Sequence, residues 1–539
     1  MSLLVQPVSG WPEPPELLKK LSALPGLFLL DSAWPSRTAK KYSFLGFAPI
    51  LTIRATSRAV TVTDLRGDKP VTTTTPASTQ DILAKLRFWL KTFSAASHPE
   101  IPFTGGAVGY FGYELGAAWE KVAPRSELDD GSEPDATWAE FSFYDGVLAY
   151  AHETSQWFCV ANNGAGRKPK AIAEFLTSQV SHALADSTVG AASSDSDATD
   201  GSKLDSAKKA GAISETSWVE SRGDRKAYLA AIERIKAYIA AGDIYQVNLA
   251  QVFSGKWHGS AAQLYERLRM RTPAPFGAFL TTGDGHLLSS SPESFLRLRA
   301  DVLETRPIKG TRARGHAPDE KQIAELIESP KERAELLMIV DLERNDLARV
   351  CRPGSVEVTE LYGVETHPTV FHLVATVRGR LTPGRDAIDA LRAMFPGGSI
   401  TGAPKIRAMQ VIRELEKSAR GPYTGAIGYF GFDGSADLNI AIRTVELRGD
   451  NVSYHVGAGI VWDSDPESEY EETLAKGRAL RAAIEGTDLG DIPAQEAVNS
   501  HGKPSCLEQM RATSPNAHFG KDAYWHGIAA SGEAKGTRA

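Results

Sequence analysis

Residues 425–461 read GAIGYFGFDGSADLNIAIRTVELRGDNVSYHVGAGIV, a succession of apolar and β-branched runs divided by short turn sequences. The pattern predicts three successive strands, at Gly425–Phe432, Asp437–Leu447 and Asn451–Val461, and a Gly-Asp-Asn turn joins the last two. A helix is predicted directly afterwards, at Pro466–Glu485. Strands that succeed one another in this way favour a sheet with a large antiparallel component.

The chain before this stretch mixes helices and strands. In Asp224–Ala241, apolar residues at Tyr228, Ile232, Ile235 and Ile239 share one helix face. The irregular alternation of the two element types indicates a layered α/β fold of the α+β type. Further strands are predicted at Ile244–Phe253, Phe276–Leu280 and Gly285–Leu298, and further helices at Gln80–Phe93, Ala261–Arg271, Pro318–Arg349 and Ala403–Glu416.

Composition divides the chain into four parts. Residues 1–185 and 218–485 carry the regular patterns, and the second of these regions is the denser one. Residues 186–217 are polar, with GAASSDSDATDGSK at 190–203, and are interpreted as an insertion or linker. Residues 486–539 form a polar C-terminal tail for which we expect disorder over most of its length.

The overall composition excludes several classes of protein. The 539 residues have a net charge of −6, and this acidic balance gives no sign of a nucleic-acid binder. Three distant cysteines, Cys159, Cys351 and Cys506, form neither a disulfide framework nor a CxxC zinc site. Neither a secretory signal nor an apolar run long enough to span a membrane is recognisable, so we expect a cytoplasmic protein.

Two pairs of glutamates lie in predicted helices. Glu332 and Glu335 are three residues apart and therefore share a helix face. Glu469 and Glu472 have the same spacing, and Lys476 lies on the same side as Glu472. If the two faces meet, they offer the carboxylate oxygens that Mg²⁺ prefers. The alternative is two ordinary solvated helix faces.

Lys309 lies in RPIKGTR, residues 306–312, where an extended strand end meets a glycine turn. A lysine held there can act as a nucleophile, and the alternative is an exposed surface lysine. The loop FPGGSITGAPK, residues 395–405, offers backbone N–H groups to an anion, unless it is an ordinary turn. Pattern alone leaves the roles of Glu293 and His372 open.

Eight of these segments, taken in order, resemble the chorismate-utilising enzymes, a family that includes anthranilate synthase component I, aminodeoxychorismate synthase component I and the isochorismate and salicylate synthases. The resemblance implies two packed antiparallel sheets with helices outside. It is sharpest over residues 218–485 and weaker in FLLDS (28–32), YSF (42–44) and GYFGYE (109–114). The eight segments are GDIYQVNL (242–249), SPESF (291–295), the Lys309 segment, DLERND (341–346), HLVATVRG (372–379), the Gly-rich loop, VGAG (456–459) and EYEETLAK (469–476).

The resemblance also implies a site that binds chorismate together with Mg²⁺. Glu335 and Glu472 would be the main metal ligands, supported through water by Glu332 and Glu469. Glu293 would be the general acid at the departing C4 hydroxyl. Arg443 suits a substrate carboxylate because its planar fork makes two bonds. The implied substrate contacts are Gln246, Gly310, Tyr423, Arg443, Gly457, Gly459 and Lys476, and the implied catalytic group is Lys309, Glu293, Thr311 and His372.

The residues at two positions distinguish the branches of the family. Gln246 stands where the water-adding members carry a lysine, so hydration of chorismate is not expected. Lys309 stands where anthranilate synthases typically have alanine, and lysine there marks the aminodeoxychorismate synthases. The resemblance therefore implies amination of chorismate to 4-amino-4-deoxychorismate, for 4-aminobenzoate and folate synthesis. The alternative is anthranilate synthase, in tryptophan synthesis.

A partner and a second ligand are also implied. The chain shows no glutaminase motif, so ammonia would come from a separate glutamine amidotransferase subunit. Some family members bind tryptophan in an N-terminal pocket, and Ser32, Tyr42, Phe44, Pro275 and Phe276 fall in the matching segments. Asp31 departs from the glutamate usual in feedback-inhibited members, so tryptophan could be a structural ligand, an inhibitor or absent.

Overall fold

The computed structural model describes residues 2–33, 41–76, 81–120, 122, 136–192, 217–314, 318–367 and 370–487. Most of the predicted polar segment, residues 193–216, and nearly all of the predicted tail lie outside the described residues. Helix α5 (Pro169–Ala192) continues past the boundary predicted at residue 185. No helix in the described ranges is long and apolar enough to cross a membrane.

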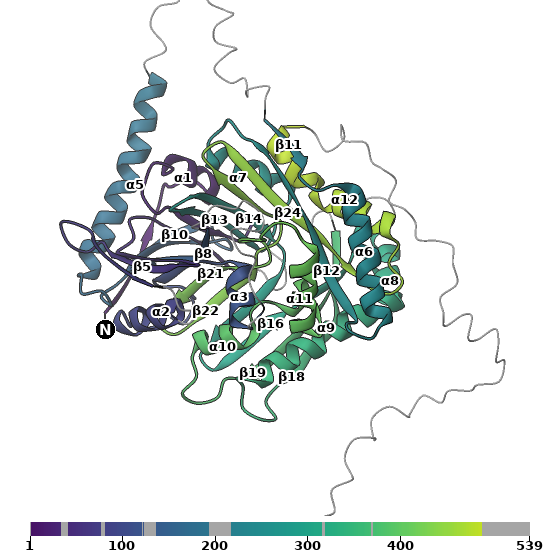
Figure 1. Cartoon of the computed structure of the whole chain (residues 1–539). Helices are drawn as coiled ribbons and strands as arrows, with labels where there is room; N and C mark the ends of the chain where they lie inside the picture. The colour runs from purple at the N-terminus through teal and green to yellow at the C-terminus, as the bar shows by residue number, and fades with distance from the viewer. Residues whose placement is uncertain are drawn as a thin grey trace, which may run out of the picture. The chain divides into compact units, whose positions relative to one another are not determined.

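Two large antiparallel sheets dominate the described chain, which confirms the predicted fold (Figure 1). The first sheet runs in the order β1 (Leu3–Val8), β10 (Gln156–Asn162), β9 (Gly146–Ala151), β3 (Tyr42–Gly46), β2 (Phe28–Asp31), β13 (Phe276–Thr282), β14 (Gly285–Ser291), β23 (Thr444–Arg448), β24 (Asn451–Ile460), β12 (Gln246–Lys256) and β11 (Trp218–Ser221), with β20 (Gly402–Ala403) paired to β12. The second runs β17 (Ile308–Ala313), β19 (Val370–Arg380), β16 (Val302–Arg306), β15 (Ser294–Arg299), β22 (Ala436–Ile440), β21 (Ala426–Gly431), β7 (Gly106–Phe111), β8 (Thr137–Tyr144), β4 (Leu51–Thr56), β5 (Ala59–Asp64) and β6 (Val71–Pro76), with β18 (Glu357–Thr366) paired to β19.

Each sheet combines strands from both patterned regions of the chain. In the first sheet β2 pairs with β13, and in the second β7 pairs with β21. One apolar cluster contains Phe28 and Phe44 from the first sheet and Val108 and Tyr429 from the second. Part of the core therefore lies between the sheets, and the N-terminal region is built into the same fold as the rest.

Two strands predicted as continuous are in fact divided between the sheets. The predicted strand Gly285–Leu298 is β14 of the first sheet and β15 of the second, and Asp437–Leu447 is likewise β22 and β23. The prediction was wrong because both sheets bury apolar faces, so the alternation continues across the crossing. Glu293 lies at one crossing and Arg443 at the other.

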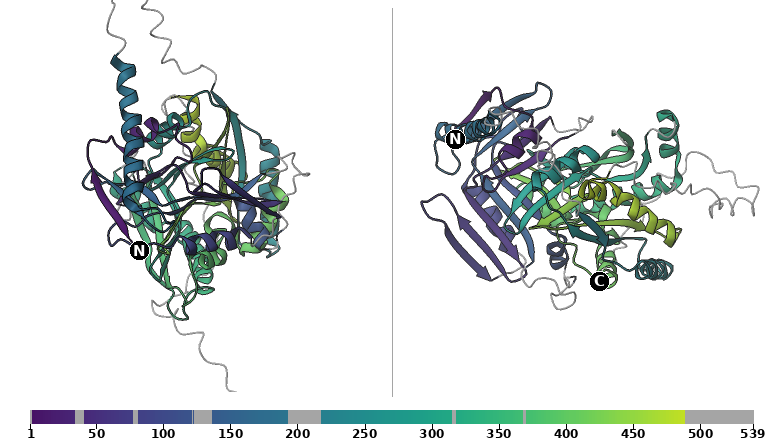
Figure 2. Two further views of the ribbon diagram at one scale, coloured as in Figure 1. Left: turned by 90° about the vertical axis from the view of Figure 1, so that its left-hand side faces the viewer. Right: turned by 90° about the horizontal axis from the view of Figure 1, so that it is seen from above.

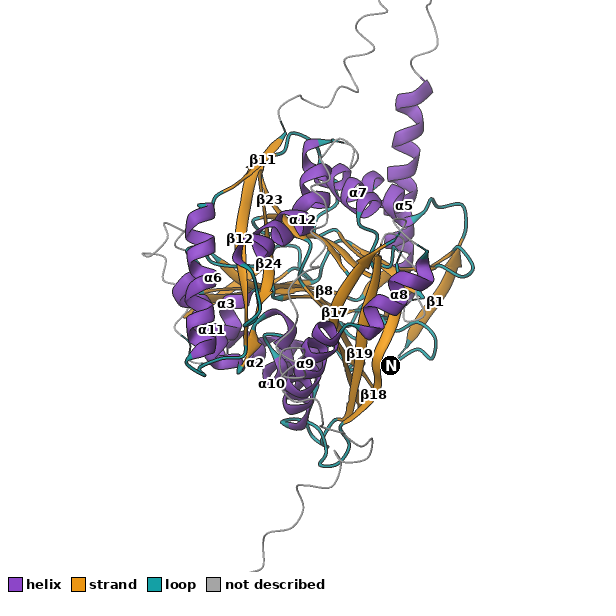
Figure 3. Cartoon of the chain, turned by 90° about the vertical axis from the view of Figure 1, so that its right-hand side faces the viewer, coloured by secondary structure: helices purple, strands orange, loops and turns teal. Residues whose placement is uncertain are grey.

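Helices cover the sheets (Figure 2). Helices α7 (Ala261–Arg271) and α12 (Pro466–Glu485) pack on β14 and β24, and α6 (Arg225–Ala240) packs on α12. On the second sheet, α9 (Pro330–Ala348) packs beside β17 and β19 (Figure 3). The remaining helices are α1 (Pro14–Lys20), α2 (Asp81–Thr92), α3 (Tyr113–Trp119), α8 (Asp319–Glu328), α10 (Ala387–Met394) and α11 (Lys405–Leu415).

The single helix predicted at Pro318–Arg349 is two helices, α8 and α9. Ser329 between them has an extended conformation, with φ −62° and ψ 112°. Its hydroxyl accepts the N–H of Glu332 at 3.4 Å and so caps α9, and Pro330 occupies the first position of that helix. A capping serine followed by proline starts a new helix more readily than it continues an old one.

Candidate active site

Lys309, on β17, lies where three elements of the fold converge. Its charge opposes the effect of burial on the pKa values of Glu293, Glu335 and Glu472, which come from a sheet crossing, from α9 and from α12. Among the described residues its amine has no hydrogen bond or ion pair. Lys309 is therefore near carboxyl groups from both glutamate-bearing helices, and its amine is available to a ligand.

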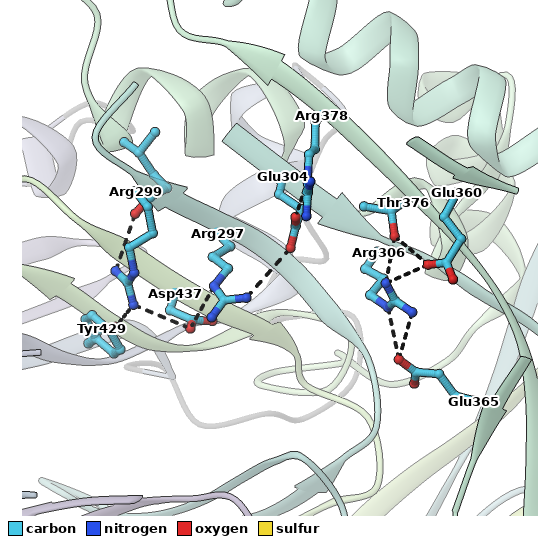
Figure 4. Close-up of polar contacts among 11 residues, drawn as sticks. Arg297, Arg299, Glu304, Arg306, Glu360, Glu365, Thr376, Arg378, Tyr429 and Asp437 are labelled. Atoms are coloured by element: carbon cyan, nitrogen blue, oxygen red, sulfur yellow. Dashed lines mark hydrogen bonds and ion pairs between the residues drawn. The ribbon is translucent and has the colours of Figure 1, made fainter. Parts of the chain in front are cut away.

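The strand that leads to Lys309 is firmly held. The guanidinium of Arg306 donates to Glu365 at 3.0 Å and to the Thr376 hydroxyl at 2.7 Å, and pairs with Glu360 at 2.8 Å (Figure 4). At Gly310, φ is +79°, and a Cβ there would lie 2.9 Å from Leu326 and 3.0 Å from a Glu332 oxygen. Only glycine suits this turn, which fixes the place of Lys309.

Glu293 is buried beside Lys309, with 4% of its surface exposed. Burial raises its pKa to about 7, against the opposing effect of the Lys309 charge. One carboxyl oxygen also accepts the N–H of Ile308 at 3.4 Å. A carboxyl group with such a pKa is partly protonated at neutral pH and can donate a proton, as a general acid must.

His372 contacts Thr311 and is influenced by the charge of Arg443. The Thr311 hydroxyl lies 3.0 Å from Nδ1 of His372, while the buried Nε2 has no hydrogen-bond partner among the described residues. Burial and the Arg443 charge lower the pKa of His372 to about 3, so the ring is neutral. Arg443 is in the left-handed region, with φ +49°, and its guanidinium has no partner among the residues that the structure describes. These unpaired groups suit a polar ligand.

The four predicted metal ligands differ in their contacts. Glu332 is paired with Arg312 at 3.2 Å, and Glu469 accepts the Ser464 hydroxyl at 2.7 Å. Burial raises the pKa of Glu335, and the neighbouring carboxylates Glu332 and Glu472 add to the increase.

Glu472 pairs with Lys476 at 2.7 Å. Burial would raise the pKa of Glu472, but Lys476 and other nearby lysines outweigh it and lower that pKa. As the side chains stand, no three potential ligands in the described ranges converge closely enough to hold a metal ion. The two facing carboxylates, Glu335 and Glu472, are nevertheless the kind of donor that Mg²⁺ uses together with water and substrate oxygens.

The opposite side of the site is formed by β12, β24 and Tyr423. Gln246 is fully buried, and neither its amide oxygen nor its nitrogen has a partner within the described part of the chain. A Cβ at Gly459 would lie 2.6 Å from that nitrogen, and one at Gly457 would lie 3.0 Å from the Tyr423 hydroxyl. Lys476 donates to the Gly457 carbonyl at 3.1 Å. The predicted substrate contacts on this side therefore lie together.

The Gly-rich loop supports this side. Asn248 of β12 donates its N–H to the Thr401 carbonyl and its amide to the Ser399 carbonyl, both at 2.9 Å. The N–H of Gly398 donates to the buried Glu343 at 3.3 Å. Two carbonyl groups of the loop therefore hold β12 in place.

The five residues of the predicted tryptophan pocket lie on neighbouring strands. Tyr42 and Phe44 stack on β3, with ring centroids 6.1 Å apart, and the buried Ser32 hydroxyl has no partner. Pro275 and Phe276 lie at the start of β13, which pairs with β2 beside Ser32. Asp31 accepts from Arg269 at 2.6 Å. Tryptophan binding there stays a prediction.

A polar layer behind Tyr423, which was not predicted from the sequence, includes Glu114, Glu416, Arg420 and His455. The ring of His455 stacks on that of Tyr423, with centroids 5.2 Å apart. Burial raises the pKa of Tyr423 to about 12. Helical spacing could not have indicated the ion pair of Glu416 and Arg420, because α11 ends at Leu415 and Glu416 is already extended.

The site lies where strands pass from one sheet to the other. It combines a lysine and carboxylates with an arginine, a tyrosine and glycines nearby. This arrangement defines an α/β enzyme site for a small anionic substrate. A family model described as chorismate binding enzyme matches residues 31–482. The chain belongs to this family of chorismate binding enzymes.

Relatives from two branches of the family are equally similar. The chain is 37% identical over 461 residues to aminodeoxychorismate synthase component 1 of Bacillus subtilis (strain 168), covering 85% of this chain and 91% of that protein. It is also 37% identical over 480 residues to anthranilate synthase component 1 of Bacillus caldotenax, covering 88% and 91%. Among solved structures, anthranilate synthase component I from Streptococcus pneumoniae TIGR4 has a TM-score of 0.67 and 29% identity, covering 82% of this chain and 92% of that one.

Proposed function

We propose that this chain is an aminodeoxychorismate synthase component I, which aminates chorismate to 4-amino-4-deoxychorismate for 4-aminobenzoate and folate synthesis. The observation that carries the proposal is the position of the Lys309 amine, which is unbound by any described residue and lies among Glu293, Glu335 and Glu472. Relatives of this name at 37% identity support it.

In the proposed mechanism the Lys309 amine attacks C2 of chorismate, and the C4 hydroxyl departs with a proton from Glu293. Ammonia then attacks C4, the bond between C2 and the lysine nitrogen breaks, and free Lys309 is restored. Covalent catalysis of this kind divides one difficult displacement into two easier ones. The reaction is an amination of the transaminase class.

The other site residues hold and orient the substrate. Arg443 and Tyr423 would bind the substrate carboxylates, and Gly457 and Gly459 would let the substrate approach the backbone of β24, since a Cβ at either position would crowd Tyr423 or Gln246. Glu335 and Glu472 would hold Mg²⁺, with Glu332 and Glu469 supporting it through water. When bound, Mg²⁺ supplies positive charge for a substrate carboxylate.

Ammonia is proposed to come from a separate glutamine amidotransferase subunit, and the enzyme is proposed to act in the cytoplasm. The names of the relatives, which call them component 1, support a second component. A tryptophan ligand at Ser32, Tyr42 and Phe44 is an additional part of the proposal.

Anthranilate synthase is the second candidate, because relatives of that name are equally similar. The test is to incubate the purified chain with chorismate, Mg²⁺ and ammonium chloride, with and without an aminodeoxychorismate lyase, and to resolve the products by mass. Formation of 4-aminobenzoate only when the lyase is present supports the proposal. Fluorescent anthranilate formed without lyase would replace it with the second candidate, and Mg²⁺-dependent binding of chorismate without turnover would indicate a binding protein.

A further inference from the structure

Arg420 is a buried arginine behind the Tyr423 side of the site, with 2% of its surface exposed. Its guanidinium makes five hydrogen bonds, which equals its number of N–H donors. Two go to the Glu416 carboxylate, at 2.8 and 2.6 Å. The other three go to the Ile400 carbonyl at 3.2 Å, the Thr424 hydroxyl at 3.2 Å and the Asn248 carbonyl at 2.8 Å.

The acceptors other than Glu416 lie on three segments next to the predicted substrate contacts. Asn248 is on β12, two residues after Gln246. Ile400 belongs to the Gly-rich loop, and Thr424 directly follows Tyr423. No backbone ladder joins all three segments, so the planar fork of Arg420 is the group that ties them to one point.

The turn at Thr424 needs this support. Its φ is +59°, a conformation that is unusual for a β-branched residue. The Thr424 hydroxyl donates to the Tyr423 carbonyl at 2.6 Å while it accepts from Arg420, and the Thr424 N–H donates to the Ala441 carbonyl at 2.8 Å. Ala441 lies two residues before Arg443. The strained turn thus fixes Tyr423 and the segment that carries Arg443.

The surroundings keep Arg420 charged and immobile. Burial alone would lower its pKa, but the Glu416 carboxylate outweighs burial and raises it. Glu416 also accepts the N–H of Ala250 on β12 at 2.9 Å. The backbone N–H groups of Arg420 and Gly421 donate to Glu114 of α3, at 2.7 and 3.0 Å. The backbone of Arg420 is therefore anchored to the first patterned region, residues 1–185, and its guanidinium to the second, residues 218–485.

We propose that Arg420 is a positioning residue of this active site, which holds the Tyr423 turn, the Gly-rich loop and the Gln246 strand in the arrangement that receives the substrate carboxylates. The proposal rests on the proposed function, since the substrate is taken to be chorismate. Arg420 itself does not touch the substrate: it acts through the acceptors on these three segments.

The first test compares Thr424→Gly with Thr424→Ser. Glycine relieves the positive φ and removes the hydroxyl, whereas serine keeps the hydroxyl. We expect T424G to melt at or near the wild-type temperature, with a KM for chorismate raised about tenfold and kcat changed much less. T424S should behave as the wild type. A T424G enzyme with wild-type KM, or one whose KM rises only as its melting temperature falls, would overturn the proposal.

The second test uses the double variant R420M/E416Q, which removes both charges and so leaves no lone buried charge. We expect a folded protein whose KM for chorismate rises more than that of T424G. The control R167M/D145N removes an ion pair of similar type, Arg167 to Asp145 at 2.8 Å, in the N-terminal strands, and should leave KM unchanged. Equal KM effects in the two double variants would contradict a positioning role.

Direct titration of chorismate separates this inference from the proposed function. If the wild-type chain binds chorismate without forming either product, the proposed function fails. The binding constants of T424G and T424S still test Arg420 in that case, because a positioning role predicts weaker binding only for T424G.

Discussion

Arg420 is buried and Arg443 is half-buried, and the polar surroundings of the two guanidinium groups are opposite. Arg420 makes five hydrogen bonds, and Arg443 has no partner among the described residues. Burial is the only influence on the pKa of Arg443, and it lowers that pKa, whereas Glu416 raises the pKa of Arg420. Charges withdrawn from water are normally paired, so the half-buried Arg443, which lacks a partner among the described residues, is the one that needs explanation.

This difference supports the proposed position of the substrate. Among the described residues, Nε2 of His372 and both ends of the Gln246 amide are buried without partners, and the half-buried Arg443 guanidinium likewise has none. In the layer behind them, Glu114 and Glu416 accept hydrogen bonds from backbone N–H groups. A ligand with carboxylates and hydroxyls would satisfy the hydrogen bonding of these unpaired groups. The hydrogen-bonded layer behind them holds them in position.

Lys309→Ala should have the largest effect on activity, because it removes the group that forms the proposed covalent bond. We expect amination with ammonium chloride to slow on the order of a thousandfold, the scale seen when a group used in the transition state is lost. The measurement is the initial rate of the lyase-coupled assay. Lys321→Ala, on the exposed side of α8, is the control. An unchanged rate for K309A would mean that ammonia attacks chorismate directly.

Glu293→Gln should slow the reaction by about 10²–10⁴-fold, since glutamine cannot donate a proton. In the wild type, Glu293 is protonated below its pKa of about 7, so kcat should fall as the pH rises through 7. The residual activity of E293Q should lack this decline. A decline of the same shape in E293Q would assign it to another group.

The raised pKa of the Glu293 carboxyl group also predicts how the stability of the protein changes with pH. The folded-state pKa of Glu293 lies above the value of 4.5 expected for an unfolded chain. The contribution of its proton to stability is therefore fully present at pH values below 4.5 and is lost as the pH rises through about 7. E293Q should lose this part of the pH dependence in urea unfolding between those values.

Arg443→Lys separates the two arginines most directly. Lysine keeps the charge but loses the planar fork, so KM for chorismate should rise by about 10–100-fold, as expected for lost hydrogen bonds to a charged group. Arg443→Met should leave the melting temperature unchanged or raise it, because it removes a half-buried charge that has no partner among the described residues. A marked loss of stability in R443M would show that Arg443 is part of the scaffold, as Arg420 is.

Much of this arrangement could be predicted from local patterns. The predicted bounds of α7 and α12 agree with the structure, since Ser260 with Gln263 and Asp465 supply capping groups within one turn. The crossings at Glu293 and Arg443 could not be predicted, because the apolar alternation does not change where a strand leaves one sheet for the other. Asn248 and Ile400, whose carbonyls accept hydrogen bonds from Arg420, are likewise distant from it in the chain. Sequence patterns therefore could not predict these contacts.

Gln246→Leu should have the smallest effect on stability. It tests whether the unpaired polar groups of the site serve the substrate and not the fold. Leucine is close in size to glutamine and removes two buried polar atoms that have no partner. Leaving such groups unsatisfied costs about 1–3 kcal/mol, so the free energy of unfolding should stay the same or rise. Chorismate binding should nevertheless weaken, because the amide faces Gly459 in the site. Urea unfolding and chorismate titration of the same sample measure both effects. A variant that loses stability but binds chorismate as tightly as the wild type would contradict this prediction. It would show that Gln246 supports the fold, as Arg420 does, and does not bind the substrate.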